Sequence, residues 1–459
     1  MNRAISFLAY RHSDNILFIK NAVLSIFLKG LSLGLVMVVA VLLARRMGPT
    51  QYGRLAYIQS IAVILSSVCT LGLRDATNRI VARYAARRNL KLLGRFISFG
   101  IAIITVVSCM MVPIVYNLLL NTSGTFKDYR FSLWTVLGVV VSLGLLSYLG
   151  PTLVALGRPV LSFSLEHIGT RLLILIVALA YTICGASLNA ETALEVTIAG
   201  NFAPVIALVA FIFIPSRLPL ALPRQASYLL KNGRVWLSIS LFMMTSPLIS
   251  LVLSETAIIV LGVYGTPSEI AFYQIARRVS GLATVCGAVA IYIALPGIAR
   301  YYILKRYDQL QNMINIINAL TIIPSVSVIL ILIIGGDRLL LLFGPEFSGA
   351  YTAALILAIG RAIDQLFGPV LEILFMIGQH AIATWINIAY GILTVLLNIA
   401  LIPYYGQSGA ATATVTAALL WKGTLYLSLR RGSSLEPCLP LALARRARHP
   451  FAGSGVRKK

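Results

Sequence analysis

The chain alternates between long apolar stretches and short polar or basic ones. Twelve apolar stretches are close to or above the roughly 20 residues that an α-helix needs to cross a membrane. They occupy residues 16–44, 55–82, 96–120, 133–156, 161–184, 194–214, 235–262, 270–298, 313–334, 353–377, 382–402 and 410–429. Lipid offers the backbone no hydrogen-bond partners, and an open sheet would leave its edges unpaired, so these stretches are expected to be helices. The pattern predicts an all-α polytopic membrane protein with about 12 transmembrane helices.

The composition supports this fold class and excludes a soluble globular protein. Charged residues make up 11% of the chain and apolar residues 59%, whereas about a quarter of a soluble globular protein is charged. Residues 1–15 carry charges without a long apolar core, so we expect a retained cytoplasmic head and not a cleaved signal. The five cysteines show no C-x-x-C spacing, which gives no indication of a metal or other cofactor.

The placement of charge predicts the orientation of the chain. Most Lys and Arg residues fall in alternate loops and in residues 431–459, and the net charge is +24. With a cytoplasmic amino terminus, few cations fall on the outer side: Arg45, Arg46, Arg54, Lys127, Arg130 and Arg338. The excess of inner cations predicts that both termini are cytoplasmic, and it accounts for the charge without a nucleic-acid partner. Residues 431–459 are expected to form a disordered basic tail near the anionic inner leaflet.

Three short matches indicate that the chain contains two similar halves. We expect an N-terminal six-helix bundle over residues 16–214, a basic cytoplasmic linker over 215–234 and a C-terminal six-helix bundle over 235–430. The matching positions are Gly48 with Gly265, Ala82-Arg83-Tyr84 with Ala299-Arg300-Tyr301, and Gly150-Pro151 with Gly368-Pro369. Because the matching residues fall at corresponding positions of the two halves, they indicate a parallel repeat. Such a repeat predicts two bundles around a central cavity.

The first predicted helix pair carries a recognisable set of short motifs. These are Leu43-Ala44-Arg45, Gly48-Pro49, Tyr52-Gly53, Gly72-Leu73 and Arg79-Ile80-Val81-Ala82. The run resembles the opening hairpin of the polysaccharide flippases, which belong to the multidrug/oligosaccharidyl-lipid/polysaccharide (MOP) transporter superfamily. Residues 402–411 resemble the outer turn before the last helix of that family. The sister lipid II flippases begin with a Ser-Arg run and usually carry two more helices, and neither feature is evident here.

The resemblance implies a function and a location. It implies a non-enzymatic flippase that moves a polyprenyl-pyrophosphate-linked oligosaccharide repeat unit from the inner to the outer leaflet by alternating access. The glycan would serve surface polysaccharide biosynthesis at the bacterial cytoplasmic (inner) membrane. The implied partners are the lipid-linked oligosaccharide, membrane lipids, and a polysaccharide polymerase with its chain-length machinery.

Five cations lie deep in the predicted helices and are candidates for binding the substrate head group: Lys29, Arg74, Arg171, Arg278 and Arg361. Transport of a sugar phosphate needs a polar lining, because charge is costly in hydrocarbon, and arginine can bind phosphate with two parallel hydrogen bonds. The alternative is snorkelling, in which the side chain extends along apolar surface to the interface. We favour snorkelling for Lys422. Arg277 and Arg278 are adjacent, so at most one of them is expected to face a cavity.

Four carboxylates are candidates for ion coupling or gating: Asp75, Glu166, Asp364 and Glu372. Asp75 and Arg79 have the i,i+4 spacing of a helical ion pair, and Arg361 and Asp364 have the i,i+3 spacing. Either pair could act as a gate or only neutralise charge inside a packed bundle. The sequence leaves the coupling ion open.

Two other functions are consistent with many apolar helices. A membrane polysaccharide polymerase or ligase would need a large external loop with catalytic groups, and the predicted outer segments are short. A cation-coupled multidrug exporter of the same superfamily would favour acidic residues at depth, and the Lys and Arg residues there argue against it.

Overall fold

The computed structural model describes residues 2–87, 89–122, 131–185, 187–216, 226–432 and 438, and their regular structure is entirely helical. The all-α prediction is therefore confirmed. In these ranges, nine helices are long and apolar enough to cross a membrane. Large apolar side chains such as Ile183 and Ile334, each 84% exposed, cover the outer surface, as expected for helices that face lipid.

The described helices group into two compact units. Unit 1 takes its residues from Met1–Met47 and Ile58–Leu248, and unit 2 takes its residues from Gly48–Tyr57 and Ile249–Lys459. The division falls inside one helix, next to Pro247, a residue that removes a helical hydrogen bond. Of the predicted linker, residues 217–225 lie outside the described residues, and the remainder belongs to helix ends.

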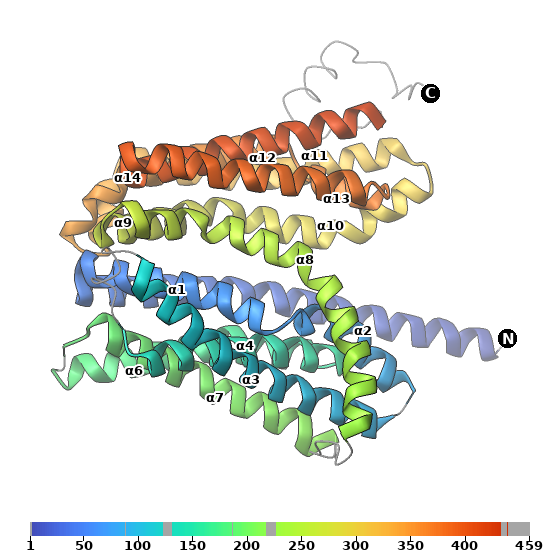
Figure 1. Cartoon of the computed structure of the whole chain (residues 1–459). Coiled ribbons are helices and arrows are strands. Elements are labelled where there is room, and N and C mark those ends of the chain that lie inside the picture. Colours follow the sequence, from blue (N-terminus) through green and yellow to red (C-terminus); the bar gives the residue numbers. More distant parts are fainter. Residues whose placement is uncertain are drawn as a thin grey trace, which may run out of the picture. The chain divides into compact units, whose positions relative to one another are not determined.

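Unit 1 is built around one central helix. Its elements are α1 (Asn2–Cys69, apart from residues 48–57), α2 (Leu73–Ala86), α3 (Leu90–Thr122), α4 (Leu133–Ala155), α5 (Pro159–Phe163), η2 (Ser164–Gly169), α6 (Thr170–Ile183), α7 (Ala190–Ser216) and the first part of α8 (Ala226–Tyr264). Helix α4 packs against α2, α3 and α7 (Figure 1). Tyr148 of α4 is fully buried, and its hydroxyl donates a hydrogen bond to the carbonyl oxygen of Phe96, 3.1 Å away.

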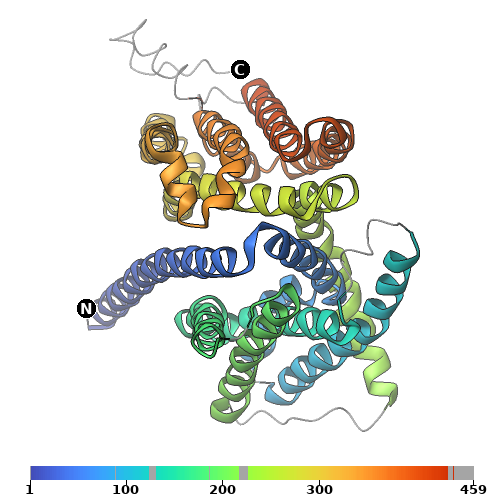
Figure 2. The same ribbon diagram turned by 90° about the vertical axis from the view of Figure 1, so that its left-hand side faces the viewer.

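Unit 2 also has a central helix. Its elements are the rest of α8, then α9 (Pro267–Gly281), η3 (Leu282–Thr284), α10 (Val285–Ile303), α11 (Tyr307–Leu341), η4 (Pro345–Ala350), α12 (Tyr351–Leu366), α13 (Val370–Met376) and α14 (His380–Gly432). Helix α12 packs against α9, α11 and α14, and Figure 2 shows the helices of each unit from a second side. In the predicted repeat, α4 and α12 correspond to the fourth segment of each half.

Glycines mark the places where the long helices bend. Helix α1 is broken at Gly48 (φ 70°, ψ 170°) and α14 at Gly406 (φ 51°, ψ −130°), where the sequence predicts turns. The predicted segment 55–82 is instead interrupted, because α1 ends at Cys69 and α2 begins after Gly72 (φ 72°). A Cβ atom on Gly72 would lie 2.1 Å from the carbonyl oxygen of Ser240. The close approach of α8 and the positive φ therefore both require glycine at this interruption.

The short segment Gly48–Tyr57 packs within unit 2, although the chain on both sides of it belongs to unit 1. A Cβ atom on Gly53 would lie 1.7 Å from the carbonyl oxygen of Pro267. The ring of Tyr52 contacts the ring of Phe347 edge to face, with 6.2 Å between the centroids. These contacts require a glycine at position 53 and an aromatic ring beside it.

Candidate functional site

The candidate site of unit 1 is centred on a widened turn between α5 and α6. Residues Ser164–Gly169 form a π-helical turn, η2, in which the backbone N–H of Thr170 donates to the carbonyl oxygen of Leu165. Such π-bulges are rare and occur frequently at functional sites. The turn carries Glu166 and His167, and the His167 ring lies 4.4 Å from the ring of Phe163 between centroids.

Three of the five predicted cations come together at this turn. The charges of Arg171 on α6, Arg74 on α2 and Lys29 on α1 all act on the His167 ring. The charge of Arg74 also acts on the carboxylate of Glu166. Lys29 and Arg74 are exposed and Arg171 is half-buried. Two of the three cations therefore lie at the surface and not in the packed core.

Glu166 lies directly against the central helix of unit 1. A Cβ atom on Gly150 would lie 2.1 Å from Oε2 of Glu166, so a larger residue at this position of α4 would displace the carboxylate. The hydroxyl of Ser162 donates to the carbonyl oxygen of Gly150, 2.7 Å away. Gly150, one of the matched positions of the predicted repeat, thus lies against the Glu166 carboxylate.

Asp75 is the second carboxylate of the unit 1 cluster. The positive charge of the neighbouring Arg74 acts on the Asp75 carboxylate. The expected partner, Arg79, is exposed on α2. Arg74 therefore interacts electrostatically with both candidate carboxylates of this unit.

In unit 2, an arginine pairs with a carboxylate that is not among the four coupling or gating candidates. Nη1 of Arg277 lies 3.0 Å from Oε1 of Glu255 and also donates to the carbonyl oxygen of Ser254 at 2.9 Å. The predicted candidate, Arg278, is half-buried, and its Nε has no hydrogen-bond partner. Of the two adjacent arginines, Arg277 makes the ion pair.

The remaining candidates of unit 2 gather near the break between α12 and α13. Nζ of Lys422 lies 3.9 Å from Oδ1 of Asp364 and donates to the carbonyl oxygen of Gly368 at 3.1 Å. The charge of Arg361 acts on the same carboxylate, and Nε of Arg361 is buried without a partner. Glu372 on α13 has a buried Oε2 without a partner. The expectation that Lys422 snorkels is wrong, since its side chain is only 12% exposed and is held by α12 and the break.

Comparison with known proteins identifies the fold of this chain. No family model matches the chain. The structure of a multidrug resistance MATE family transporter of the MOP superfamily, in an inward-facing conformation, matches 92% of this chain and 99% of its own at 12% identity and a TM-score of 0.72. The lipid II flippase MurJ, in an inward closed conformation, matches 89% of this chain and 87% of its own at 16% identity and a TM-score of 0.67. This chain has the fold of the MOP superfamily transporters.

The sequence is also similar to that of a curated protein. This chain is 26% identical over 192 residues to the probable low-salt glycan biosynthesis flippase Agl15 of Haloferax volcanii. The match covers 40% of this chain and 39% of the relative's length. The resemblance to the flippases of this superfamily is therefore confirmed, and the chain is a multi-pass membrane protein whose relatives are transporters and flippases.

Sequence reasoning missed three features of this chain. His167 was overlooked because a single histidine in an apolar segment gives no signal, and the π-turn that presents it has no sequence signature. The Arg277–Glu255 pair joins α9 to α8, so helical spacing could not reveal it. Lys422 was misjudged because its partners lie on other helices. Among the residues that the structure describes, no group of three or more His, Cys, Asp or Glu side chains could hold a metal ion.

Proposed function

We propose that this protein is a flippase that moves a polyprenyl-pyrophosphate-linked oligosaccharide repeat unit from the inner to the outer leaflet by alternating access. The observation that carries the proposal is the convergence of Lys29, Arg74 and Arg171 on the η2 turn. It occurs in a fold that a lipid II flippase shares. The product would serve surface polysaccharide biosynthesis at a bacterial cytoplasmic membrane, with a polymerase and chain-length machinery as partners.

The chemistry of the cluster suits a pyrophosphate diester. Such a group carries two negative charges on several acceptor oxygens, and two guanidinium groups and an ammonium group supply a surplus of donors and positive charge. Binding these charges inside a membrane needs compensating cations, because isolated charge is strongly disfavoured there. Arg278 and Arg361 would complete a cationic path in unit 2, with Asp75, Glu166, Asp364 and Glu372 as coupling or gating groups.

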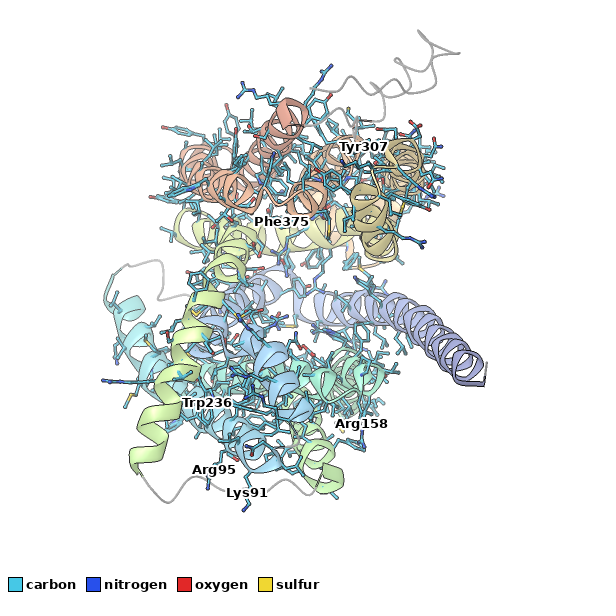
Figure 3. The ribbon with its side chains drawn as sticks, turned by 90° about the vertical axis from the view of Figure 1, so that its right-hand side faces the viewer. Lys91, Arg95, Arg158, Trp236, Tyr307 and Phe375 are labelled. Carbon is cyan, nitrogen blue, oxygen red and sulfur yellow. The ribbon has the colours of Figure 1, made fainter. Side chains whose placement is uncertain are left out.

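The distribution of basic residues supports the proposed orientation. Lys91 and Arg95, expected on the cytoplasmic side, lie close together near the start of α3, and Arg158, with the same expectation, lies at the α4–α5 connection (Figure 3). In unit 2, cations likewise lie at helix ends, namely at the α10–α11 connection and at the end of α14. Twelve spanning helices with both termini cytoplasmic would place all these residues on one side of the membrane. The broken helices α1 and α14 would each supply two of the twelve.

The proposal is tested by locating the lipid-linked oligosaccharide in cells that express variants. In cells depleted of the wild-type chain, Arg74→Ala and Arg171→Ala should leave complete repeat units on the inner leaflet, shielded from an impermeant sugar-oxidising label on spheroplasts. Arg361→Ala should do the same if the path extends into unit 2. Arg79→Ala, which removes an exposed charge from the same helix as Arg74, is the matched control and should support normal surface glycan.

Other outcomes would point to other functions. Units that label outside but stay unpolymerised would indicate a polymerase or ligase, or a partner of one. The MATE-type fold favours a multidrug exporter as the second candidate. That function would be supported if all the variants make normal glycan while the wild-type chain lowers cellular accumulation of a cationic dye.

A further inference from the structure

Arg361 lies inside a membrane-spanning part of unit 2 without a partner for its charge. It is on α12, the central helix of the unit, within the apolar span Pro345–Met376. Its Nε atom is buried and has no hydrogen-bond partner, and no ion pair among the residues that the structure describes includes it. Charge is costly at such a position, and the residues that carry it mark ligand or ion pathways. The unpaired guanidinium therefore needs an explanation beyond packing.

Helices α9, α12 and α14 meet directly before Arg361 in α12. A Cβ atom on Gly360 would lie 2.3 Å from Cγ2 of Val415 on α14, so α12 and α14 are in close contact there. The hydroxyl groups of the adjacent Thr414 and of Tyr273 on α9 lie 3.1 Å apart in a hydrogen bond. These four residues form a three-helix junction. Arg361 leaves α12 next to it.

Two other cations near the three-helix junction already have carboxylate partners. Nη1 of Arg277, one turn along α9 from the bonded tyrosine, lies 3.0 Å from Oε1 of Glu255. Nζ of Lys422 on α14 lies 3.9 Å from Oδ1 of Asp364, which is one turn further along α12. Together with Arg361, this group holds three cations and two carboxylates. It therefore has one positive charge in excess, and that charge is on the arginine without a partner.

Two further charged residues of unit 2 do not change this balance. Arg278 is adjacent to Arg277, and consecutive side chains leave a helix about 100° apart, so it points in a different direction from the paired arginine. Glu372 lies beyond the break, on α13, and its buried Oε2 has no hydrogen-bond partner. It therefore does not neutralise Arg361.

We infer that Arg361 recognises a carboxylate of the glycan, so that the transported oligosaccharide contains an acidic sugar such as a uronic acid. The inference deepens the proposed function and rests on it. One excess cation matches one negative charge, whereas a pyrophosphate diester brings two. The planar guanidinium also fits a carboxylate, which can accept two parallel hydrogen bonds from it. A neutral sugar would leave the charge of Arg361 without compensation, so the acidic sugar binds more tightly.

An arginine that is kept for a ligand should lower the stability of the empty protein. An uncompensated buried charge is destabilising, and its removal relieves that cost. Arg361→Gln should therefore unfold at the same temperature as the wild type or at a higher one, in detergent and without ligand. An arginine that served only to hold helices together would give the opposite result.

The main test compares two probes that differ by one carboxylate. Both are short-chain polyprenyl-pyrophosphate monosaccharides, one with glucuronic acid and the other with glucose. Titration calorimetry of the full-length protein in detergent, near neutral pH, gives the dissociation constant of each probe. The wild type should bind the glucuronic acid probe about tenfold more tightly, as expected for one charge-assisted contact.

Matched variants show whether this preference comes from Arg361. Arg361→Gln should bind the two probes about equally. Arg361→Lys keeps the charge but lacks the planar fork, so it should retain only part of the preference. Arg338→Gln removes an exposed arginine of α11 in the same unit and should keep the full preference.

Four results would overturn the inference. They are equal affinity of the wild type for the two probes, a preference that survives in Arg361→Gln, a preference lost in Arg338→Gln, and a lower unfolding temperature of Arg361→Gln. Each of these leaves the flippase proposal standing, because the wild type still binds a pyrophosphate-linked sugar. Failure of the wild type to bind either probe would instead remove the proposed function and this inference together.

Discussion

The ammonium group of Lys422 donates a hydrogen bond to the carbonyl oxygen of Gly368, 3.1 Å away. Gly368 has a φ of 68° and lies between the end of α12 and the start of α13. Lys422 comes from α14, so it ties that helix to the break in its neighbour. In unit 1 the corresponding carbonyl, that of Gly150, accepts from the hydroxyl of Ser162, and α4 continues through Pro151. The same dipeptide therefore produces a break in one unit and a continuous helix in the other.

Lys422→Met should destabilise unit 2. It leaves the Gly368 carbonyl without its side-chain donor and Asp364 without the nearby cation, and a lost buried hydrogen bond costs about 1–3 kcal/mol. We expect a lower thermal unfolding temperature in detergent. Adding Asp364→Asn should recover part of the loss, because the neutral amide no longer needs a cation. Strictly additive effects of the two substitutions would show that these side chains are not coupled.

Gly150→Ala should impair transport more than folding. The new methyl group would lie 2.1 Å from Oε2 of Glu166, and that side chain can swing aside while α4 stays in place. We expect about a tenfold loss of leaflet transfer, which corresponds to about 1.4 kcal/mol. Gly138→Ala in the same helix is the control, since its methyl group would meet the Ile198 side chain, with Cδ1 at 2.9 Å, and no carboxylate. Equal losses in both variants would mean that helix packing, and not the carboxylate, is responsible.

Gly53→Ala should weaken the packing of the segment Gly48–Tyr57 within unit 2. Its methyl group would lie 1.7 Å from a backbone carbonyl oxygen, which cannot move aside as a side chain can. Overpacking of this kind typically costs about 1–3 kcal/mol, and thermal unfolding with fluorescence detection would measure it. Gly34→Ala in the same helix α1 meets nothing within 4 Å. This control should be neutral or slightly stabilising.

Removing both partners of the Arg277–Glu255 pair should be tolerated better than removing one. Glu255→Gln alone leaves the guanidinium of Arg277 without its carboxylate, and breaking a mostly buried pair is costly. The double variant Arg277→Gln, Glu255→Gln loses both charges and should regain most of the expression and transport. If the double variant is stable but inactive, Arg277 contributes to the substrate path and not only to packing.

The all-helical fold class and the main turns could be predicted from the sequence because they depend on local chemistry. Apolar runs of membrane length must be helical, and Gly48 and Gly406 mark turns because glycine adopts positive φ without strain. The interruption before α2 could not be predicted in the same way. Gly72 is required there by the backbone of Ser240, a residue far away in the chain.

The candidate site was predicted in part for the same reason. Lys29, Arg74 and Arg171 were recognisable because each is a charge inside an apolar segment, which is costly and therefore informative. That these three converge on one histidine depends on how α1, α2 and α6 pack, and no spacing within one helix encodes it. The ion pair of Arg277 likewise joins two helices.

The sequence by itself determined that this protein is an all-helical chain with the motifs of the polysaccharide flippases, and it identified which residues carry charge at depth. These features follow from hydropathy and from the conformations allowed to single residues. Only the tertiary structure decided that Glu166 rests on Gly150 beside Arg74, that Lys422 holds the break at Gly368, and that residues 48–57 pack within unit 2. Each of these is a contact between distant parts of the chain, and such contacts form only when helices pack.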